Sequence, residues 1–161
     1  MEGEVYAAII GAGVALLSMF VGSTLNRKQR TREELYAYKV KAYAKLAELF
    51  SQVKQDFSVL AFLDTGSDVV PFEESRSPIQ IDEYFRRNVF ENYLFFTHET
   101  KLRIEQFADK ITDSSRITFN HAIMPDLVKP DDLRKNYEEI INNCNEEIDK
   151  LYYEIGLHKI K

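Results

Sequence analysis

The hydrophobic and polar positions divide this chain into an uncharged apolar run and a longer amphipathic region. Residues 5–25 contain no charged side chain. A helix of that length, at about 1.5 Å per residue, spans roughly the 30 Å hydrocarbon core of a bilayer. A cleaved signal peptide is the alternative, but Glu2 and Glu4 precede the run, where a signal peptide carries positive charge. The pattern predicts a retained transmembrane helix within residues 1–26, with a short outside tail.

From residue 27 onward, apolar residues recur every three or four positions, which is the period of amphipathic helices. A first long helix is expected to end near Gly66. Ser77 is a candidate N-cap and Pro78 a favourable first residue for a second helix, which is expected to reach about Phe96. The apolar stripe of the first helix comprises Ala42, Leu46, Leu49, Val53 and Leu60.

Two further helices are expected in the second half of the chain. Thr97 is a candidate N-cap for the third helix, and the segment 112–115 is a candidate bend or break within it. The last helix is expected to begin at Pro130 and to stop at Gly156. Its apolar stripe steps by three or four throughout and comprises Leu133, Tyr137, Ile140, Cys144, Ile148, Leu151 and Ile155.

These elements predict an all-α fold with two parts. The N-terminal transmembrane helix occupies residues 1–26, and a cytoplasmic antiparallel bundle of three to four helices occupies residues 27–161. Thr31 and Glu34 match a capping box, so the sequence leaves open whether a new helix begins there or the membrane helix continues unbroken.

The charges suggest an orientation for the predicted membrane helix. Four basic residues follow the apolar run: Arg27, Lys28, Arg30 and Arg32. Because positive charge stays on the cytoplasmic side, we expect the N-terminus outside and the remaining chain in the cytoplasm, at the inner membrane. The cluster would also attract anionic lipid headgroups of the bilayer, by about 1 kcal/mol per residue. The formal net charge of −5 argues against a surface for double-stranded nucleic acid.

Small residues form a stripe within the apolar run. They are spaced three, four, three and four positions apart: Ala8, Gly11, Ala15, Ser18 and Gly22. Small residues let membrane helices approach closely, and the chain offers no second span as a partner. The stripe therefore predicts a homo-oligomer, although glycine and alanine are common in membrane helices in any case.

The sequence contains few residues that indicate catalysis. The three histidines and the single Cys144 have no metal-ligand spacing, and no nucleophile or phosphate-loop motif is present outside the apolar run. We therefore expect no metal, no cofactor and no enzymatic activity. A hydrolase whose site is assembled between distant helices remains an alternative that no motif would reveal.

One segment, residues 84–103, combines aromatic and basic side chains at high density. Its candidate ligand-binding residues are Arg86, Arg87, His98, Lys101 and Arg103. Bases stacking on aromatic rings and phosphates bound by arginine would make this segment a nucleotide-binding face. The alternative is an aromatic core seam flanked by ordinary surface charges.

The layout as a whole resembles two groups of proteins. The segments "REELYAYKVKAYAKL", "ENYLFFTHETKLRIEQF" and "IDKLYYEIGL" after a basic stop are similar to uncharacterised small bacterial single-pass membrane-anchored helical proteins. In architecture alone, the chain resembles small membrane effectors of prokaryotic antiviral systems. The first resemblance implies a membrane-anchored, self-associating scaffold acting through a cytoplasmic protein partner. The second implies a pore-forming or lesion-forming effector triggered by a partner or a small nucleotide.

Overall fold

The structure is a computed structural model that describes the backbone of residues 2–63, 76–124 and 128–156, with side chains from residue 26 onward. Every regular element in these ranges is helical, which agrees with the predicted all-α class. The long helices are α1 (Glu2–Leu63), α2 (Pro78–Phe90), α3 (His98–Ile123) and α4 (Pro130–Glu154), and the 3₁₀ turn η2 (Tyr93–Phe95) lies between α2 and α3.

The prediction of an N-terminal transmembrane helix is wrong. Among the described residues, no helix combines the length and the apolar character needed to cross a membrane. Helix α1 runs from Glu2 to Leu63, so of the two alternatives left open by the sequence the unbroken helix is the one observed. Neither glycine nor proline occurs in residues 23–65, so nothing in the chain ends the helix after the apolar run. The predicted seam of Ala8, Gly11, Ala15, Ser18 and Gly22 lies outside the described side chains, and self-association stays a prediction.

The chain forms two compact units, Met1–Lys39 and Val40–Lys161. In the first unit, the side chains of Arg27, Lys28, Arg30 and Arg32 are exposed. Arg30 pairs with Glu34 at 3.2 Å, and the Thr31 hydroxyl donates to the Arg27 carbonyl at 2.9 Å. Thr31 is therefore an interior helix residue and not an N-cap. The role of the basic cluster at a lipid surface stays a prediction.

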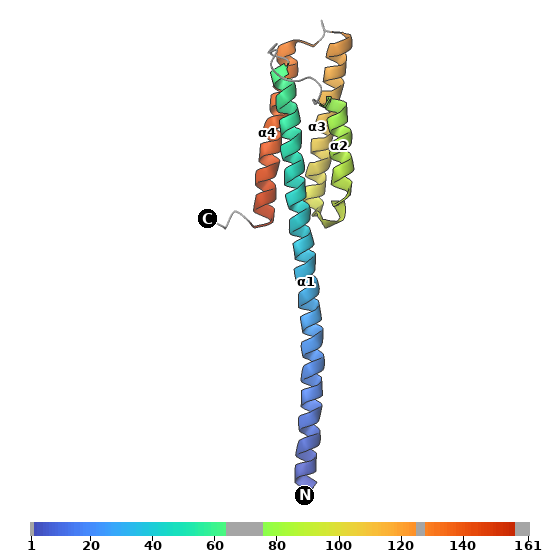
Figure 1. The fold of residues 1–161 in the computed structure, drawn as a ribbon, viewed down its shortest axis with the longest axis vertical. Helices are drawn as coiled ribbons and strands as arrows, with labels where there is room; N and C mark the ends of the chain where they lie inside the picture. Colours follow the sequence, from blue (N-terminus) through green and yellow to red (C-terminus); the bar gives the residue numbers. More distant parts are fainter. Residues whose placement is uncertain (1, 64–75, 125–127, 157–161) are drawn as a thin grey trace. The chain divides into compact units, whose positions relative to one another are not determined.

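The second unit is an antiparallel helical bundle (Figure 1). Contacts between residues distant in sequence establish the alternating directions of the helices. The end of α1 meets the start of α2 through Asp56 and Arg76, 3.2 Å apart. The start of α3 meets the end of α4 through Arg103 and Glu154. The predicted bundle is thus confirmed for this part of the chain.

Aromatic rings from all four long helices form the centre of the bundle core. Phe50 of α1 lies 4.8 Å from Phe107 of α3 and 5.6 Å from Phe85 of α2, measured between ring centroids. Phe57 of α1 contacts Tyr137 of α4 at 5.6 Å. The two predicted apolar stripes are buried at most of their positions, and Leu60 and Ile148 are partly buried against the core.

The helix ends follow local signals in most places. The Ser77 backbone N–H donates to Gln80 Oε1 at 2.9 Å, and Thr97 Oγ1 accepts from the Thr100 backbone N–H at 3.2 Å, as expected for N-terminal caps. Helix α2 ends at Phe90, earlier than expected, because η2 turns the chain. Helix α3 continues through residues 112–115 without a break, and the hydroxyls of Thr112 and Ser115 hydrogen-bond to the carbonyls of Ala108 and Ile111, one turn earlier.

Candidate functional site

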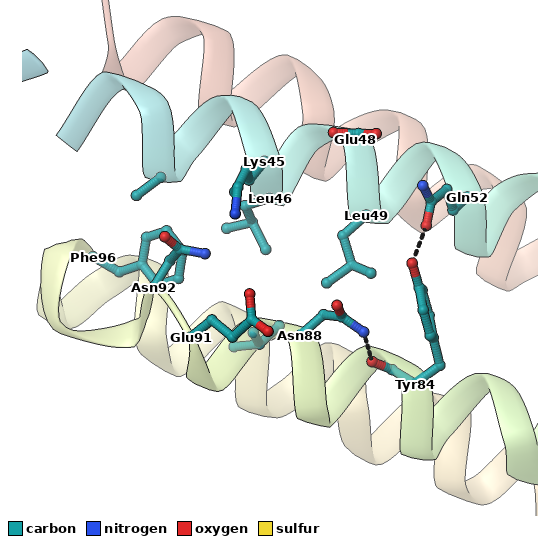
Figure 2. A pocket seen from close by; sticks show the side chains of 12 residues that line it. Lys45, Leu46, Glu48, Leu49, Gln52, Tyr84, Asn88, Glu91, Asn92 and Phe96 are labelled. Atoms are coloured by element: carbon teal, nitrogen blue, oxygen red, sulfur yellow. Dashed lines mark hydrogen bonds between the residues drawn. The ribbon is translucent and has the colours of Figure 1, made fainter. Parts of the chain in front are cut away.

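A groove between α1 and the end of α2 combines an apolar floor with a polar rim (Figure 2). We call it the α1–α2 groove. Its floor consists of Ala42, Leu46, Leu49, Val89 and Phe96, and its rim consists of Lys45, Glu48, Gln52, Tyr84, Asn88, Glu91 and Asn92. The groove therefore combines an apolar floor with charged and amide side chains on both sides.

The helical period explains this composition. On α1, Lys45, Glu48 and Gln52 are three or four residues apart, so they share one face beside the buried stripe. Tyr84 and Asn88 lie four residues apart on α2, beside the buried Val89, whereas Glu91 and Asn92 lie in the turn that follows the end of α2 at Phe90. The rim residues are thus the positions at which each amphipathic face changes from apolar to polar.

Hydrogen bonds fix one end of the groove. The Tyr84 hydroxyl donates to Gln52 Oε1 at 2.6 Å, and Asn88 Nδ2 donates to the Tyr84 carbonyl at 2.7 Å. The Arg76 guanidinium lies 4.0 Å from the centroid of the Tyr84 ring and pairs with Asp56. Burial raises the pKa of Asp56, and the charge of Arg76 offsets only part of that rise. The Tyr84 side chain is therefore held at its ring by Arg76 and at its hydroxyl by Gln52.

The charged side chains along the rest of the rim have no ionic partner among the described residues. Lys45, Glu48 and Glu91 are exposed and form no ion pair there. Figure 2 shows Lys45 from α1 and Glu91, which directly follows α2, extending into the space between the two elements. The Asn92 carboxamide also makes no hydrogen bond within the described chain, and it lines the groove from the turn after α2. These groups are available to a second molecule.

The size of the groove restricts what it can hold. It encloses about 200 Å³, whereas sites that engulf a small molecule usually measure about 300–1,000 Å³. A shallow, open surface of mixed polarity is instead typical of contacts with another polypeptide.

The structure places the residues of the predicted ligand face in different environments. Arg86 pairs with Asp82 at 2.9 Å and with Asp109 at 3.6 Å, and Lys101 lies 4.8 Å above the ring of Tyr93. Arg87 and His98 are exposed. The aromatic residues of the same segment are also divided, because Phe85 is buried whereas Phe90 is 73% exposed. A nucleotide-binding role for this face stays a prediction.

Arg103 contacts acidic side chains of α4 within the bundle. Its guanidinium pairs with Glu154, and its Nε lies 3.0 Å from Glu147, at an angle unsuited to a hydrogen bond. Thr100 Oγ1 donates to Glu154 at 2.7 Å and lies 3.1 Å from the Tyr43 hydroxyl. We call these five residues the Arg103 network, which joins α1, α3 and α4 inside the bundle.

Burial of Glu154 by itself would raise its pKa. The hydrogen bonds from Thr100 and Arg103, together with the Arg103 charge, outweigh that effect and hold the Glu154 pKa below its ordinary value. The network therefore favours the ionised carboxylate and stabilises the end of α4 against α1 and α3.

The described residues provide no site with obvious metal or thiol chemistry. No group of three or more histidine, cysteine, aspartate or glutamate side chains in the described ranges could hold a metal ion. Burial raises the pKa of Cys144 to about 12, which leaves its thiol protonated. No protein-family model, curated protein or solved structure matches this chain.

Sequence reasoning missed the amides of the groove. Asparagine is a weak helix former, so Asn88 inside the short helix α2 was the available signal. Asn92 lies in the turn after α2, where asparagine is common, and gave no such signal. The apolar floor could not be identified in advance, since it depends on how α1 and α2 pair.

Proposed function

We propose that this protein is a helical scaffold that binds a protein partner through the α1–α2 groove. The observation that carries the proposal is the rim of Lys45, Glu48 and Glu91, which retain no ionic partner among the described residues above an apolar floor. The role is one of binding and needs no catalytic residue. The alternative function of a membrane effector required the predicted transmembrane helix. Because the structure contradicts that helix, this function is not proposed.

The physical argument concerns where charges are left unpaired. Elsewhere in the bundle, many charged side chains have partners, such as Arg86 with Asp82 and Lys110 with Glu139. Charged groups around a small apolar area give an interface its specificity and speed up encounter, while the apolar area supplies affinity. The rim carries both signs of charge, so a partner must present both signs in a matching order.

Photocrosslinking tests this function in the cells that produce the protein. A photoreactive amino acid replaces Glu91 in the full chain, and a matched variant carries it at Asp149, an exposed position on α4. We expect a discrete adduct from position 91 alone. Mass spectrometry then identifies the partner, and the purified partner is titrated against the full-length protein.

Variants with reversed charges test whether the measured binding depends on the rim of the groove. We expect Lys45→Glu and Glu91→Lys each to weaken the affinity about tenfold, mostly through slower association, while Asp149→Lys leaves it unchanged. The proposal is wrong if positions 91 and 149 give the same adducts, or if the purified partner binds both reversed variants with the affinity of the original protein.

A further inference from the structure

We propose that a crevice between α2 and α3 binds a small organic cation, namely an ammonium ion that carries apolar substituents. We call this feature the α2–α3 crevice. Its floor consists of four buried side chains: Phe85, Val89, Ile104 and Ala108. Its mouth consists of Arg86, Phe90, Tyr93 and Glu105. The crevice lies on the α3 side of α2, so the inference concerns a different surface from the α1–α2 groove and goes beyond the proposed function.

The size and the lining of the crevice suit a small molecule. It encloses about 270 Å³, close to the lower end of the range of about 300–1,000 Å³ that small-molecule sites occupy. Such sites are lined mainly by apolar and aromatic side chains, with a few polar groups that orient the ligand. The α2–α3 crevice has this composition, because only Arg86 and Glu105 among its lining residues are charged. A ligand can therefore bury an apolar part on the floor and keep a charged part at the mouth.

Two aromatic rings at the mouth are arranged to attract a cation. The ring centroids of Phe90 and Tyr93 are 5.8 Å apart, and the ring planes are inclined by 35°. The negative faces of aromatic rings attract ammonium groups, and quaternary ammonium ions are bound in this way. The Lys101 ammonium lies 4.8 Å from the centroid of the Tyr93 ring but does not line the crevice. Phe90 is 73% exposed and has no cation above its ring within the described chain, so its face is open to a ligand.

A carboxylate lies beside these rings. The Tyr93 hydroxyl donates to Glu105 Oε1 at 2.7 Å, which holds the carboxylate at the mouth of the crevice. This hydrogen bond raises the pKa of Tyr93, so the proton stays on the phenol and the negative charge stays on Glu105. Glu105 forms no ion pair among the described residues, and its second oxygen accepts no hydrogen bond from them. The carboxylate can therefore neutralise a cation that contacts the rings.

The positive charge at the mouth is already matched. Arg86 pairs with Asp82 at 2.9 Å and with Asp109 at 3.6 Å. An anion would have to compete with two carboxylates for this guanidinium, whereas a cation meets the unpaired carboxylate of Glu105. The charges around the crevice therefore favour a cation over the phosphate group considered above for Arg86.

The lining also restricts the kind of cation. A divalent metal ion such as Ca²⁺ requires about six or more oxygen ligands, whereas Glu105 provides the only carboxylate that lines the crevice. An unsubstituted ammonium ion is compact and strongly hydrated, so it gains little from an apolar floor. An ammonium ion with apolar substituents can contact the rings through its charged head and the floor near Ile104 through its substituents.

Three probes that share a benzyl group test the role of charge: benzyltrimethylammonium, the neutral benzyl alcohol and the anion phenylacetate. Each probe is titrated into the ¹⁵N-labelled full-length protein, and the amide chemical shifts report both the affinity and the location of binding. We expect benzyltrimethylammonium to bind about tenfold more tightly than benzyl alcohol, because it adds contacts with the rings and the carboxylate. Phenylacetate should bind more weakly than both. The shift changes should be concentrated in residues 85–108.

Two protein variants, each with a matched control, separate the contributions of the carboxylate and the ring. Glu105→Gln keeps the size of the side chain and removes its charge, and Glu146→Gln makes the same change at an exposed position on α4. Phe90→Leu keeps an apolar side chain but removes the ring. Its control is Phe119→Leu, at a position that is 63% exposed and outside the crevice.

The expected losses in the variants are specific to the cation. Glu105→Gln and Phe90→Leu should each weaken the binding of benzyltrimethylammonium about threefold, and the two controls should leave it unchanged. Binding of benzyl alcohol should be the same in all four variants. Thermal unfolding followed by circular dichroism should also be unchanged, because both altered side chains are exposed.

The inference is supported if benzyltrimethylammonium is the tightest probe and only Glu105→Gln and Phe90→Leu weaken its binding. It is wrong if benzyl alcohol binds as tightly as the cation, since the crevice would then recognise apolar groups alone. It is also wrong if phenylacetate binds most tightly, which would indicate an anion site at Arg86, or if no shift changes occur in residues 85–108. None of these outcomes bears on the α1–α2 groove, which the crosslinking experiment tests separately.

Discussion

The Arg103 network and the rim of the α1–α2 groove use the same kinds of side chain for different purposes. In the network, the charge of Arg103 is neutralised by Glu147 and Glu154, and the carboxylate of Glu154 is further bonded by Thr100. On the rim, Lys45 and Glu91 have no ionic partner among the described residues. Charge alone therefore does not mark a binding site in this protein.

The difference between the two regions is how completely the charges are satisfied. A partly buried ion pair stabilises a fold when hydrogen bonds satisfy its remaining atoms, and removing one partner leaves a costly charge behind. An exposed charge with no partner contributes little to folding because water solvates it. Polar groups that are engaged inside the bundle hold helices together, whereas those left over can bind another molecule.

The largest expected effect comes from breaking the network at its centre. Arg103→Ala leaves Glu154, which is 21% exposed, without its cation, while Glu147 keeps only its ion pair with Lys150 at 2.7 Å. We expect the free energy of unfolding to fall by about 3 kcal/mol, measured by urea denaturation of the full chain. Arg86→Ala is the matched control, since the Arg86 side chain is 44% exposed and its loss should cost less than about 1 kcal/mol. Equal losses in the two variants would contradict the comparison.

A smaller loss of stability is expected when Glu154, the carboxylate that Arg103 and Thr100 bind, is replaced. Since the pKa of Glu154 is lowered in the folded state, its contribution is complete above the ordinary glutamate pKa and is lost as the pH falls through the folded value. We expect Glu154→Gln to cost about 1–2 kcal/mol at pH 7. The difference between the two proteins should shrink progressively below about pH 4.5.

The measurement for Glu154 is a series of urea denaturations between pH 7 and pH 3. Glu146→Gln is the control, because Glu146 is 67% exposed and lies 4.0 Å from Lys150, so its loss should matter little at any pH. A difference between Glu154→Gln and the original protein that stays constant with pH would show that the carboxylate is not held in its ionised form.

The periodicity of apolar residues predicted the helices well because it records which face each helix buries. The stripe from Ala42 to Val53 and the stripe from Leu133 to Leu151 are buried at nearly every position. The N-caps at Ser77 and Thr97 were also readable, since capping depends on residues close in sequence. The bundle could therefore be anticipated from local information.

The remaining features depend on contacts that local patterns do not record. The transmembrane helix was wrongly predicted, because that prediction rested on the length and missing charge of one run alone. Arg103 was assigned to a ligand face because its partners, Glu147 and Glu154, lie on a different helix. The groove likewise exists only because α1 and α2 pack side by side. The apolar periodicity shows which face each helix buries, but it does not specify which helix packs against which.

The smallest expected effect on stability comes from the rim itself. Lys45→Ala and Glu91→Ala each remove an exposed side chain without an ionic partner among the described residues, so the free energy of unfolding should change by less than about 0.5 kcal/mol. Urea denaturation of the full chain measures this change. The same variants should weaken binding of the purified partner, because each removes a charge that the partner would contact and that the folded chain does not use. A loss of stability comparable to that of Arg103→Ala would mean that the rim charges serve the fold, and the distinction between the two regions would then disappear.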